Sequence, residues 1–317
     1  MGRLPNVYLV GAPKAGTTSL AHWLARHPDV HFSVPKEPYY WAYDYPRLRA
    51  HYGFETFQAY AGLFASEAAQ RAPVIAEGST VYLYSETAVP EIMAANPSAK
   101  VILALRNPPD LLVSYHRTQV VALNEDELDF GRAWRRSLTG GLPATDPLDV
   151  KLVDYPTIGR LGLAVDRLVQ VTPAAQIHVV QFEDLQNRPD HVWRQLCSFL
   201  ELTPEPSPTF VVRNKSTKQY RSAWIRQLTH RPPDLLQEPM RHARQWSRTT
   251  QNRTVRAVKQ WMWRPAPRPD AVAGLRLDLA AYFASDIAQL ERRLGLDLSA
   301  WKAGGQAPPP AAQTDNE

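Results

Sequence analysis

Residues 11–18 read GAPKAGTT and are of the types that bind a phosphate group. They follow the apolar run 6–10, and a helical pattern begins directly after them, which is typical of a strand, a loop and a helix. At such a junction, backbone N–H groups and the positive end of the helix dipole point at one anion. Lys14 adds a positive charge, and Thr17 and Thr18 add hydroxyl donors. We therefore predict an anion site here rather than a plain tight turn.

The position of the lysine separates this loop from the usual nucleotide P-loop. That motif, G-x-x-x-x-G-K-[ST], places its lysine directly after the second glycine. Here Thr17 follows Gly16, and the lysine lies earlier, at position 14. No carboxylate pattern typical of a magnesium site follows the predicted strands that end near residues 105 and 182. Both observations weaken an NTPase interpretation.

A second anion-binding group is predicted at Arg106. It comes directly after the apolar run 100–105, and α/β folds place ligands at the carboxyl ends of such strands. Its guanidinium can hold a phosphate with two parallel hydrogen bonds. Ser114 follows eight residues later, about two helical turns along, so its hydroxyl can return to the same place. The alternatives are an ion pair between Arg106 and Asp110, and a Ser114 hydroxyl bonded to its own helix.

These segments together resemble the sulfotransferases that use 3′-phosphoadenosine 5′-phosphosulfate (PAPS). GAPKAGTTSL at 11–20 resembles their 5′-phosphosulfate loop, and VILALRNPPDLLVSY at 101–115 resembles their 3′-phosphate segment. Residues 177–185 with 199–200, and residues 279–301, resemble segments of the bacterial and heparan-type branch. The resemblance implies transfer of a sulfuryl group from PAPS to an acceptor hydroxyl, with no metal. The implied contacts to PAPS are Lys14, Ala15, Gly16, Thr17, Thr18 and Ser19 at the 5′-phosphosulfate, and Arg106 and Ser114 at the 3′-phosphate.

The resemblance also implies the catalytic groups. KEPYYW at 36–41 resembles a segment in which the glutamate is the base, so Glu37 is expected to deprotonate the acceptor, unless it is a surface glutamate paired with Lys36. Lys14 is expected to stabilise the bridging oxygen as adenosine 3′,5′-bisphosphate (PAP) leaves. Glu77 is a second candidate, as an acceptor contact or an alternative base. Gly78 stands where heparan-type enzymes carry a lysine, which puts a heparan-like acceptor in doubt.

The basic segment 213–218 resembles, more loosely, a loop that closes over the 3′-phosphate. Lys215 is the best candidate there, with Ser216 and Thr217 as hydroxyl donors. A solvated basic loop is the alternative.

The elements that must position these residues alternate along the chain. Short apolar runs at 6–10, 74–77, 100–105 and 177–182 predict buried strands, and helical patterns separate them. We expect an α/β, P-loop-like three-layer fold with a central, mostly parallel sheet flanked by helices. One sulfotransferase domain would span residues 1–303, followed by a disordered Gly/Pro/Ala-rich tail at 304–317. The helices are predicted at 86–95, 109–120, 127–138, 157–171, 188–202 and 271–294.

Composition narrows the class of protein. The 317 residues include 36 Lys and Arg against 31 Asp and Glu, a net charge of +5 that suggests an affinity for anions. Cys197 is the one cysteine, which excludes an internal disulfide and a cysteine-based zinc site, and its apolar setting predicts a buried thiol. No signal peptide or membrane-length apolar run is present, so we expect a cytoplasmic protein.

Within 221–269 a basic, tryptophan-containing helical segment is expected. Residues 239–269 hold eight basic residues, three tryptophans and no acid. A solvated helix with its tryptophans packed inward is preferred, peripheral contact with an anionic surface is possible, and nucleic acid is not expected.

The sequence does not identify the acceptor. Residues 39–62, 139–155 and 221–269 are expected to shape its pocket, and a sugar, a glycolipid, a polyketide or a small alcohol all remain open. Two other functions also remain: a P-loop nucleotide-dependent kinase and a non-catalytic polyanion-binding protein.

Overall fold

The computed structural model describes residues 3–210 and 273–302, together with short stretches and single residues between 218 and 265. A five-stranded sheet with strand order β2-β3-β1-β4-β5 forms its centre, and every neighbouring pair is parallel. The predicted parallel α/β architecture is therefore confirmed. The strands are β1 (Val7–Gly11), β2 (Val30–Phe32), β3 (Val74–Glu77), β4 (Lys100–Leu105) and β5 (Ile177–Gln181).

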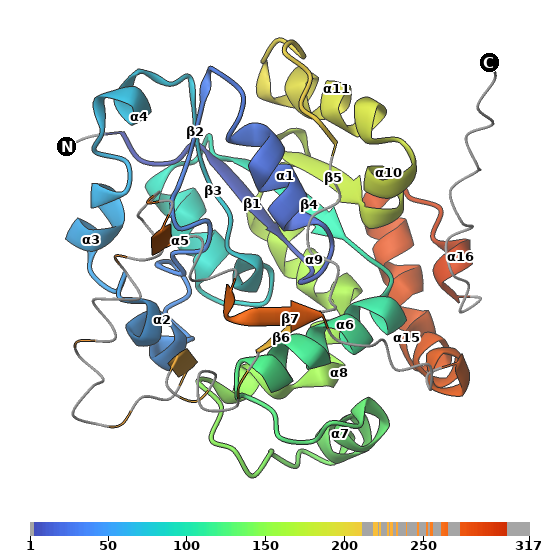
Figure 1. Ribbon diagram of the computed structural model, residues 1–317. Coiled ribbons are helices and arrows are strands. Elements are labelled where there is room, and N and C mark those ends of the chain that lie inside the picture. Colours follow the sequence, from blue (N-terminus) through green and yellow to red (C-terminus); the bar gives the residue numbers. More distant parts are fainter. Residues whose placement is uncertain are drawn as a thin grey trace, which may run out of the picture.

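Helices cover both faces of this sheet (Figure 1). Helix α1 (Thr17–Leu24) packs on β1 and β2 on one face, beside α10 (Phe182–Asn187) and α11 (Pro189–Leu200), which pack on β5. On the other face lie α5 (Ala88–Ala95) and α9 (Leu161–Val171). The strands consist of continuous apolar runs because both of their faces are buried.

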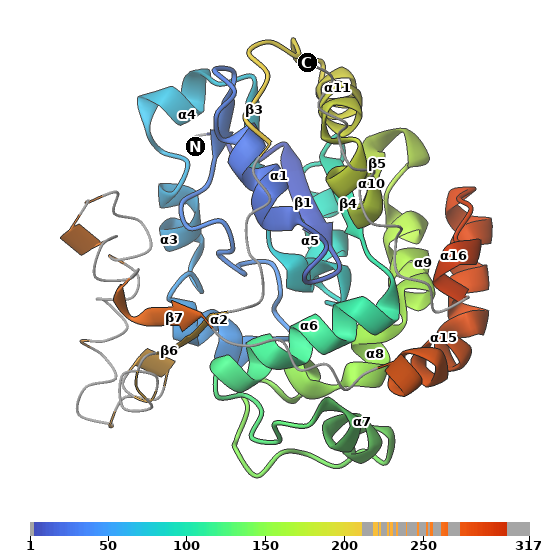
Figure 2. The ribbon, with the colours of Figure 1, turned by 45° about the vertical axis from the view of Figure 1, so that its right-hand side comes forward.

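A third set of helices stands outside these layers. Helix α15 (Ala273–Leu294) packs along α9 and α6 (Pro108–Val121), at the edge of the molecule that Figure 2 brings forward. Arg276 of α15 forms an ion pair with Asp110 in the first turn of α6. The remaining elements are α2 (Pro46–Tyr52), α3 (Phe57–Gly62), α4 (Glu67–Arg71), η1 (Thr80–Leu83), α7 (Phe130–Leu138), η2 (Val150–Val153), α8 (Tyr155–Gly159), η3 (Ala174–Gln176), α16 (Ser299–Lys302), β6 (Lys218–Tyr220) and β7 (Trp263–Pro265).

Two of the predicted helices differ from the observed ones. The helix predicted at 157–171 is wrong as one element, because Arg160 has ψ 73 and separates α8 from α9. The helix predicted at 127–138 begins only at Phe130. Asp129 has extended backbone and its carboxylate accepts the N–H of Arg132 at 2.8 Å, so it caps α7.

The basic segment also differs from its expectation. Trp263 belongs to β7, which pairs antiparallel with β6, so a helix is wrong for residues 263–265. Trp246 and Trp261 are 57% and 59% exposed, so the inward packing expected of these two indoles is wrong. The predicted tail at 304–317 lies outside the described residues.

Two further observations concern burial and the membrane. Cys197 is 1% exposed, which confirms the buried thiol. In the part of the chain that is described, no helix combines the length and apolarity needed to cross a bilayer.

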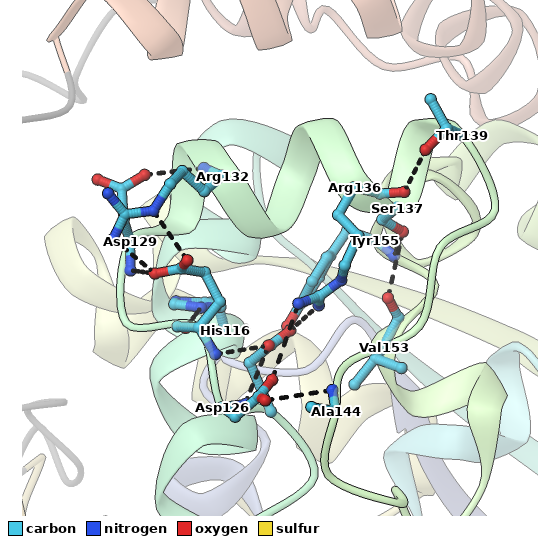
Figure 3. A network of polar contacts seen from close by, with 12 residues as sticks. His116, Asp126, Asp129, Arg132, Arg136, Ser137, Thr139, Ala144, Val153 and Tyr155 are labelled. Carbon is cyan, nitrogen blue, oxygen red and sulfur yellow. Dashed lines mark hydrogen bonds and ion pairs between the residues drawn. The ribbon is translucent and has the colours of Figure 1, made fainter.

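A buried acid attaches the loop between α7 and α8 to the rest of the fold. The fully buried carboxylate of Glu125 contacts Arg136 at 2.6 Å and accepts the Tyr155 hydroxyl at 2.8 Å. Beside it the Ala144 N–H donates to Asp126 at 3.1 Å (Figure 3). Helices α7 and α8 and the loop between them are thereby held against the segment that follows α6.

We expect the Phe283→Ala variant to lose about 3–5 kcal/mol of unfolding free energy, because a large side chain leaves a well-packed interior. Phe283 is 1% exposed and its ring centroid lies 5.8 Å from that of Trp134. Denaturant unfolding followed by circular dichroism measures the loss. Leu277→Ala is the control on the same helix, since Leu277 is 61% exposed and should change stability by under ~0.5 kcal/mol. Equal losses in both variants would contradict this packing.

Candidate functional site

A cavity of about 320 Å³ opens at the carboxyl edge of the sheet. Its lining comes from the segments that follow β1, β4 and β5 and from the loops expected to shape the acceptor pocket. The lining residues are Pro13, Lys14, Gly16, Thr17, Thr18, Ser19, Trp23, Glu37, Tyr39, Leu48, Tyr52, Thr80, Val81, Arg106, Tyr115, Thr118, Gln119, Ala122, Asn124, Leu148, Leu152, Phe182, Leu185, Gln186 and His230.

The loop after β1 presents the start of α1 to this cavity. Gly16 is the N-cap residue of α1 with φ 84, so no side chain caps the first turn. An added Cβ on Gly16 would lie 2.2 Å from a Leu185 side-chain carbon, so a glycine is needed for both conformation and space. The first N–H groups of a helix have no partner within it. Thr17 and Thr18 lie at the same helix start, so the structure brings together the groups predicted to bind an anion, and their binding of an anion stays a prediction.

Lys14 and Arg106 meet at this helix start. Arg106 Nη1 donates to the Lys14 carbonyl at 3.0 Å, and its guanidinium carbon lies 4.3 Å from the centroid of the Phe182 ring. Burial, with Arg106 and Arg117 nearby, holds the pKa of Lys14 below its usual value, and Glu37 opposes this shift. Two clustered cations in a partly dry site favour a bound anion. The alternative pair of Arg106 with Asp110 is not formed, because Asp110 pairs with Arg276.

The Glu37 carboxylate lines the same cavity and has two close partners. Lys36 Nζ lies 2.6 Å from Oε1, and the Tyr39 hydroxyl donates to Oε2 at 2.5 Å. Lys36 Nζ also donates to Thr17 Oγ1 at 3.2 Å, so this lysine joins Glu37 to the phosphate loop. The ion pair between Glu37 and Lys36, expected as the alternative, is formed, and its glutamate lines the cavity.

A second glutamate lies beneath this segment. Glu77 is fully buried, and it accepts hydrogen bonds from the hydroxyls of Tyr60 at 2.9 Å, Tyr82 at 3.1 Å and Ser79 at 3.2 Å. Burial raises the pKa of Glu77 to about 8, although these hydroxyls lower it. Glu77 does not line the cavity, so it is not placed to contact an acceptor or to act as an alternative base.

The Glu77 network instead fixes the backbone that carries Glu37. Ser79 Oγ accepts the Tyr39 N–H at 3.2 Å, and the Tyr82 hydroxyl accepts the Trp41 N–H at 3.2 Å. Tyr39 has φ 62, a conformation that non-glycine residues rarely adopt and that must be held by its surroundings. The buried acid therefore acts on the site through the backbone of residues 39–41.

Gly78 adjoins the same segment through its N–H, which donates to the Lys36 carbonyl at 3.0 Å. An added Cβ would lie 3.1 Å from Leu9 Cβ and 3.2 Å from Phe32 Cζ. A side chain at position 78, including the lysine of heparan-type enzymes, would therefore require its packed neighbours to shift.

Of the other predicted site residues, some line the cavity and some do not. Ser19 lines the cavity, whereas Ala15 is fully buried and Ser114, which is also buried, is not among the lining residues. The role of Ser114 stays a prediction. Lys215, Ser216 and Thr217 lie outside the described residues.

Two contributors, Tyr39 and Phe182, were not singled out from the sequence, and Lys36 was named there only as the partner of a surface Glu37. Tyr39 lies two residues after Glu37, and this proximity in the chain was the available signal. Phe182, the first residue of α10, contacts Arg106, and no local pattern connects these two residues.

Comparisons with known proteins identify the class. The family model for the sulfotransferase domain matches residues 4–252, so the chain belongs to the sulfotransferase family. It is 25% identical over 201 residues to the human bifunctional heparan sulfate N-deacetylase/N-sulfotransferase 1, covering 63% of this chain and 22% of that protein. It is 31% identical over 148 residues to human carbohydrate sulfotransferase 15, covering 35% of this chain and 26% of that protein. The chain thus matches about a quarter or less of these two relatives.

The fold is also seen in a solved structure. The sulfotransferase from Alicyclobacillus acidocaldarius aligns with a TM-score of 0.66 at 23% identity, covering 95% of this chain and 99% of that one. The likeness supports the three-layer fold. Across the described residues, no group of three or more His, Cys, Asp or Glu side chains is arranged to hold a metal ion.

The pKa of Glu77 leads to a prediction about stability. Between its ordinary pKa of 4.5 and about 8, the folded state keeps a proton that the unfolded state has lost. Unfolding free energy should therefore fall as pH rises through this range, by roughly 1 kcal/mol per pH unit more in the wild type than in Glu77→Gln. Denaturant unfolding at pH 5, 6, 7 and 8 measures the difference. Glu91→Gln, at an exposed carboxylate, should keep the wild-type slope. Equal slopes for wild type and Glu77→Gln would contradict the assignment.

Proposed function

We propose that this protein transfers a sulfuryl group from PAPS to an acceptor hydroxyl by in-line displacement. Glu37 takes the proton of the acceptor hydroxyl, whose oxygen forms a new bond to sulfur. The bond between sulfur and the bridging oxygen of the 5′-phosphate breaks, and its electron pair remains on that oxygen. The products are a sulfate ester, PAP and one proton, so atoms and charge balance.

One observation carries the proposal: the start of α1, the Lys14–Arg106 pair and the Glu37 carboxylate all line a single cavity. The start of α1 with Lys14 fits the 5′-phosphosulfate, and Arg106 fits a second phosphate. A carboxylate on the same cavity supplies the base that transfer to a hydroxyl needs.

The neighbours of Glu37 suit this role. Lys36 joins Glu37 to Thr17, which places the base beside the loop that would hold the transferred group. The Tyr39 hydroxyl fixes the second carboxylate oxygen.

Lys14 would stabilise the charge that develops on the bridging oxygen. Its pKa is held down by burial and by Arg106, and an incoming anion would reverse this shift by pairing with the ammonium group. A kinase is less well supported, because Thr17 occupies the position of the P-loop lysine.

Replacing Lys14 by Ala should lower turnover of PAPS by about 10²–10³-fold, because the leaving oxygen loses its cation in a partly dry site. Release of PAP is measured with 1-octanol, methyl β-D-glucopyranoside and an unsulfated heparosan oligosaccharide as acceptors. Lys302→Ala is the matched control, since Lys302 pairs with Glu291 away from the cavity and should keep wild-type turnover. Near-normal turnover in Lys14→Ala would rule out this role.

Replacing Glu37 by Gln should keep the affinity for PAP and lower transfer by about 10²–10⁴-fold, because the amide cannot accept the proton. Calorimetric titration with PAP and the same transfer assay separate the two effects, with Glu91→Gln as the control. Transfer at more than a tenth of the wild-type rate would mean that the base lies elsewhere.

A further inference from the structure

The cavity has two chemically different parts. Among the described lining residues, the three charged side chains are Lys14, Arg106 and Glu37. Lys14 and Arg106 contact each other, and Lys36 connects Glu37 to the phosphate loop, so all three charges lie at the proposed donor site. His230 also lines the cavity.

Beyond Glu37, the described lining residues of 39–52, 80–81, 115–124 and 148–152 form the acceptor wall, and none of these carries a charge. The Tyr39 ring lies next to the Tyr52 ring, with centroids 4.9 Å apart. Tyr52 and Leu48 both come from α2, and the Leu48 N–H donates to Asp149 at 2.7 Å. This bond holds α2 against the loop that contributes Leu148 and Leu152, and Val81 lines the cavity from η1. An acceptor next to Glu37 would therefore meet aromatic and aliphatic surface.

The cationic side chains of α2 and η2 make contacts away from the cavity. Arg47 donates to both carboxylate oxygens of Asp146 at 2.8 and 2.5 Å, and Lys151 pairs with Asp44 at 2.7 Å. The guanidinium of Arg49 lies over a tyrosine ring at 4.5 Å and donates to a backbone carbonyl at 3.0 Å. None of these three cations lines the cavity. Arg47, Arg49 and Lys151 therefore lie near the acceptor wall, but their positive charges contact other groups of the protein.

Two of the amide side chains that line the cavity, Asn124 and Gln119, are also paired with the protein. Asn124 Nδ2 donates to Gln119 Oε1 at 2.9 Å, and Asn124 Oδ1 accepts the Leu148 N–H at 2.9 Å. These bonds shape the wall and use hydrogen-bonding capacity that a polar acceptor would otherwise claim.

We propose that the acceptor is an alcohol whose hydroxyl is carried on a neutral, largely apolar body, and that it is not an anionic sugar chain. This inference rests on the proposed sulfuryl transfer and narrows its substrate class. An anionic acceptor would place its charge against the apolar side chains of this wall, which is costly. An apolar body gains from each methylene that leaves water, about fourfold in affinity per buried CH₂.

A series of linear alcohols tests this class. With PAPS as donor, kcat/KM should rise about threefold to fourfold per methylene from 1-butanol through 1-hexanol to 1-octanol until the wall is covered. Methyl β-D-glucopyranoside and the unsulfated heparosan oligosaccharide should be at least tenfold poorer than 1-octanol. Sulfated products are quantified by mass spectrometry.

A lysine introduced into the acceptor wall gives a second test of the apolar acceptor class. Leu148→Lys should lower kcat/KM for 1-octanol at least tenfold and leave the affinity for PAP unchanged, because the donor half is untouched. Leu142→Lys is the matched control on the same loop, since Leu142 is 55% exposed and does not line the cavity. Equal effects of the two lysines on 1-octanol transfer would overturn the assignment of this wall.

The remaining outcomes separate the two proposals. If the protein binds PAP but prefers the heparosan oligosaccharide or the glucoside, or transfers to none of the alcohols, the acceptor class is overturned while the sulfotransferase proposal stands. If the protein does not bind PAP, the proposed function fails and the acceptor class fails with it.

Discussion

The parallel pairing of β1 with β4 is the constraint on which the site depends. The register places Gly11 opposite Ala104, so both strands end at the same edge of the sheet. The loop with Lys14 and the turn with Arg106 therefore emerge side by side, and one hydrogen bond between them closes the arrangement. Because like charges repel, this pair of cations is stable beside an anion. The sheet thus brings together two cations that a bound anion would stabilise.

Glu37, the proposed base, belongs to a different part of the fold. The segment 36–41 lies beside β3 rather than in it, and a buried acid with its ring of hydroxyls sets the positions of Tyr39 and Trp41. Burying Glu77 raises its pKa to about 8, so the acid stays protonated at neutral pH and avoids the cost of an unpaired buried charge. Polar interactions inside the core, not flexibility at the surface, thereby locate the carboxylate that faces the cavity.

The fold, and the position of Lys14, Thr17 and Arg106 on one cavity, could be predicted because their signals are local. The run 100–105 and the loop at 11–18 each carry their own pattern of spacing and residue type. β2 has only three residues, too few for a period to be seen, and α2 and α3 are short helices in a stretch without clear amphipathicity. The hydrogen bond of Glu77 with Tyr60 joins residues 17 apart, and the contact of Arg106 with Phe182 joins the residues that directly follow β4 and β5. Tertiary structure alone brings such pairs together.

Binding of PAP tests the central claim most directly, because it needs both phosphate sites at once. Calorimetric titration of the metal-free protein would compare PAP with adenosine 5′-monophosphate and with ATP–Mg. Preference for PAP is the predicted result. Preference for ATP–Mg would move the protein to the kinases, and binding of none of the three would favour a non-catalytic, polyanion-binding role.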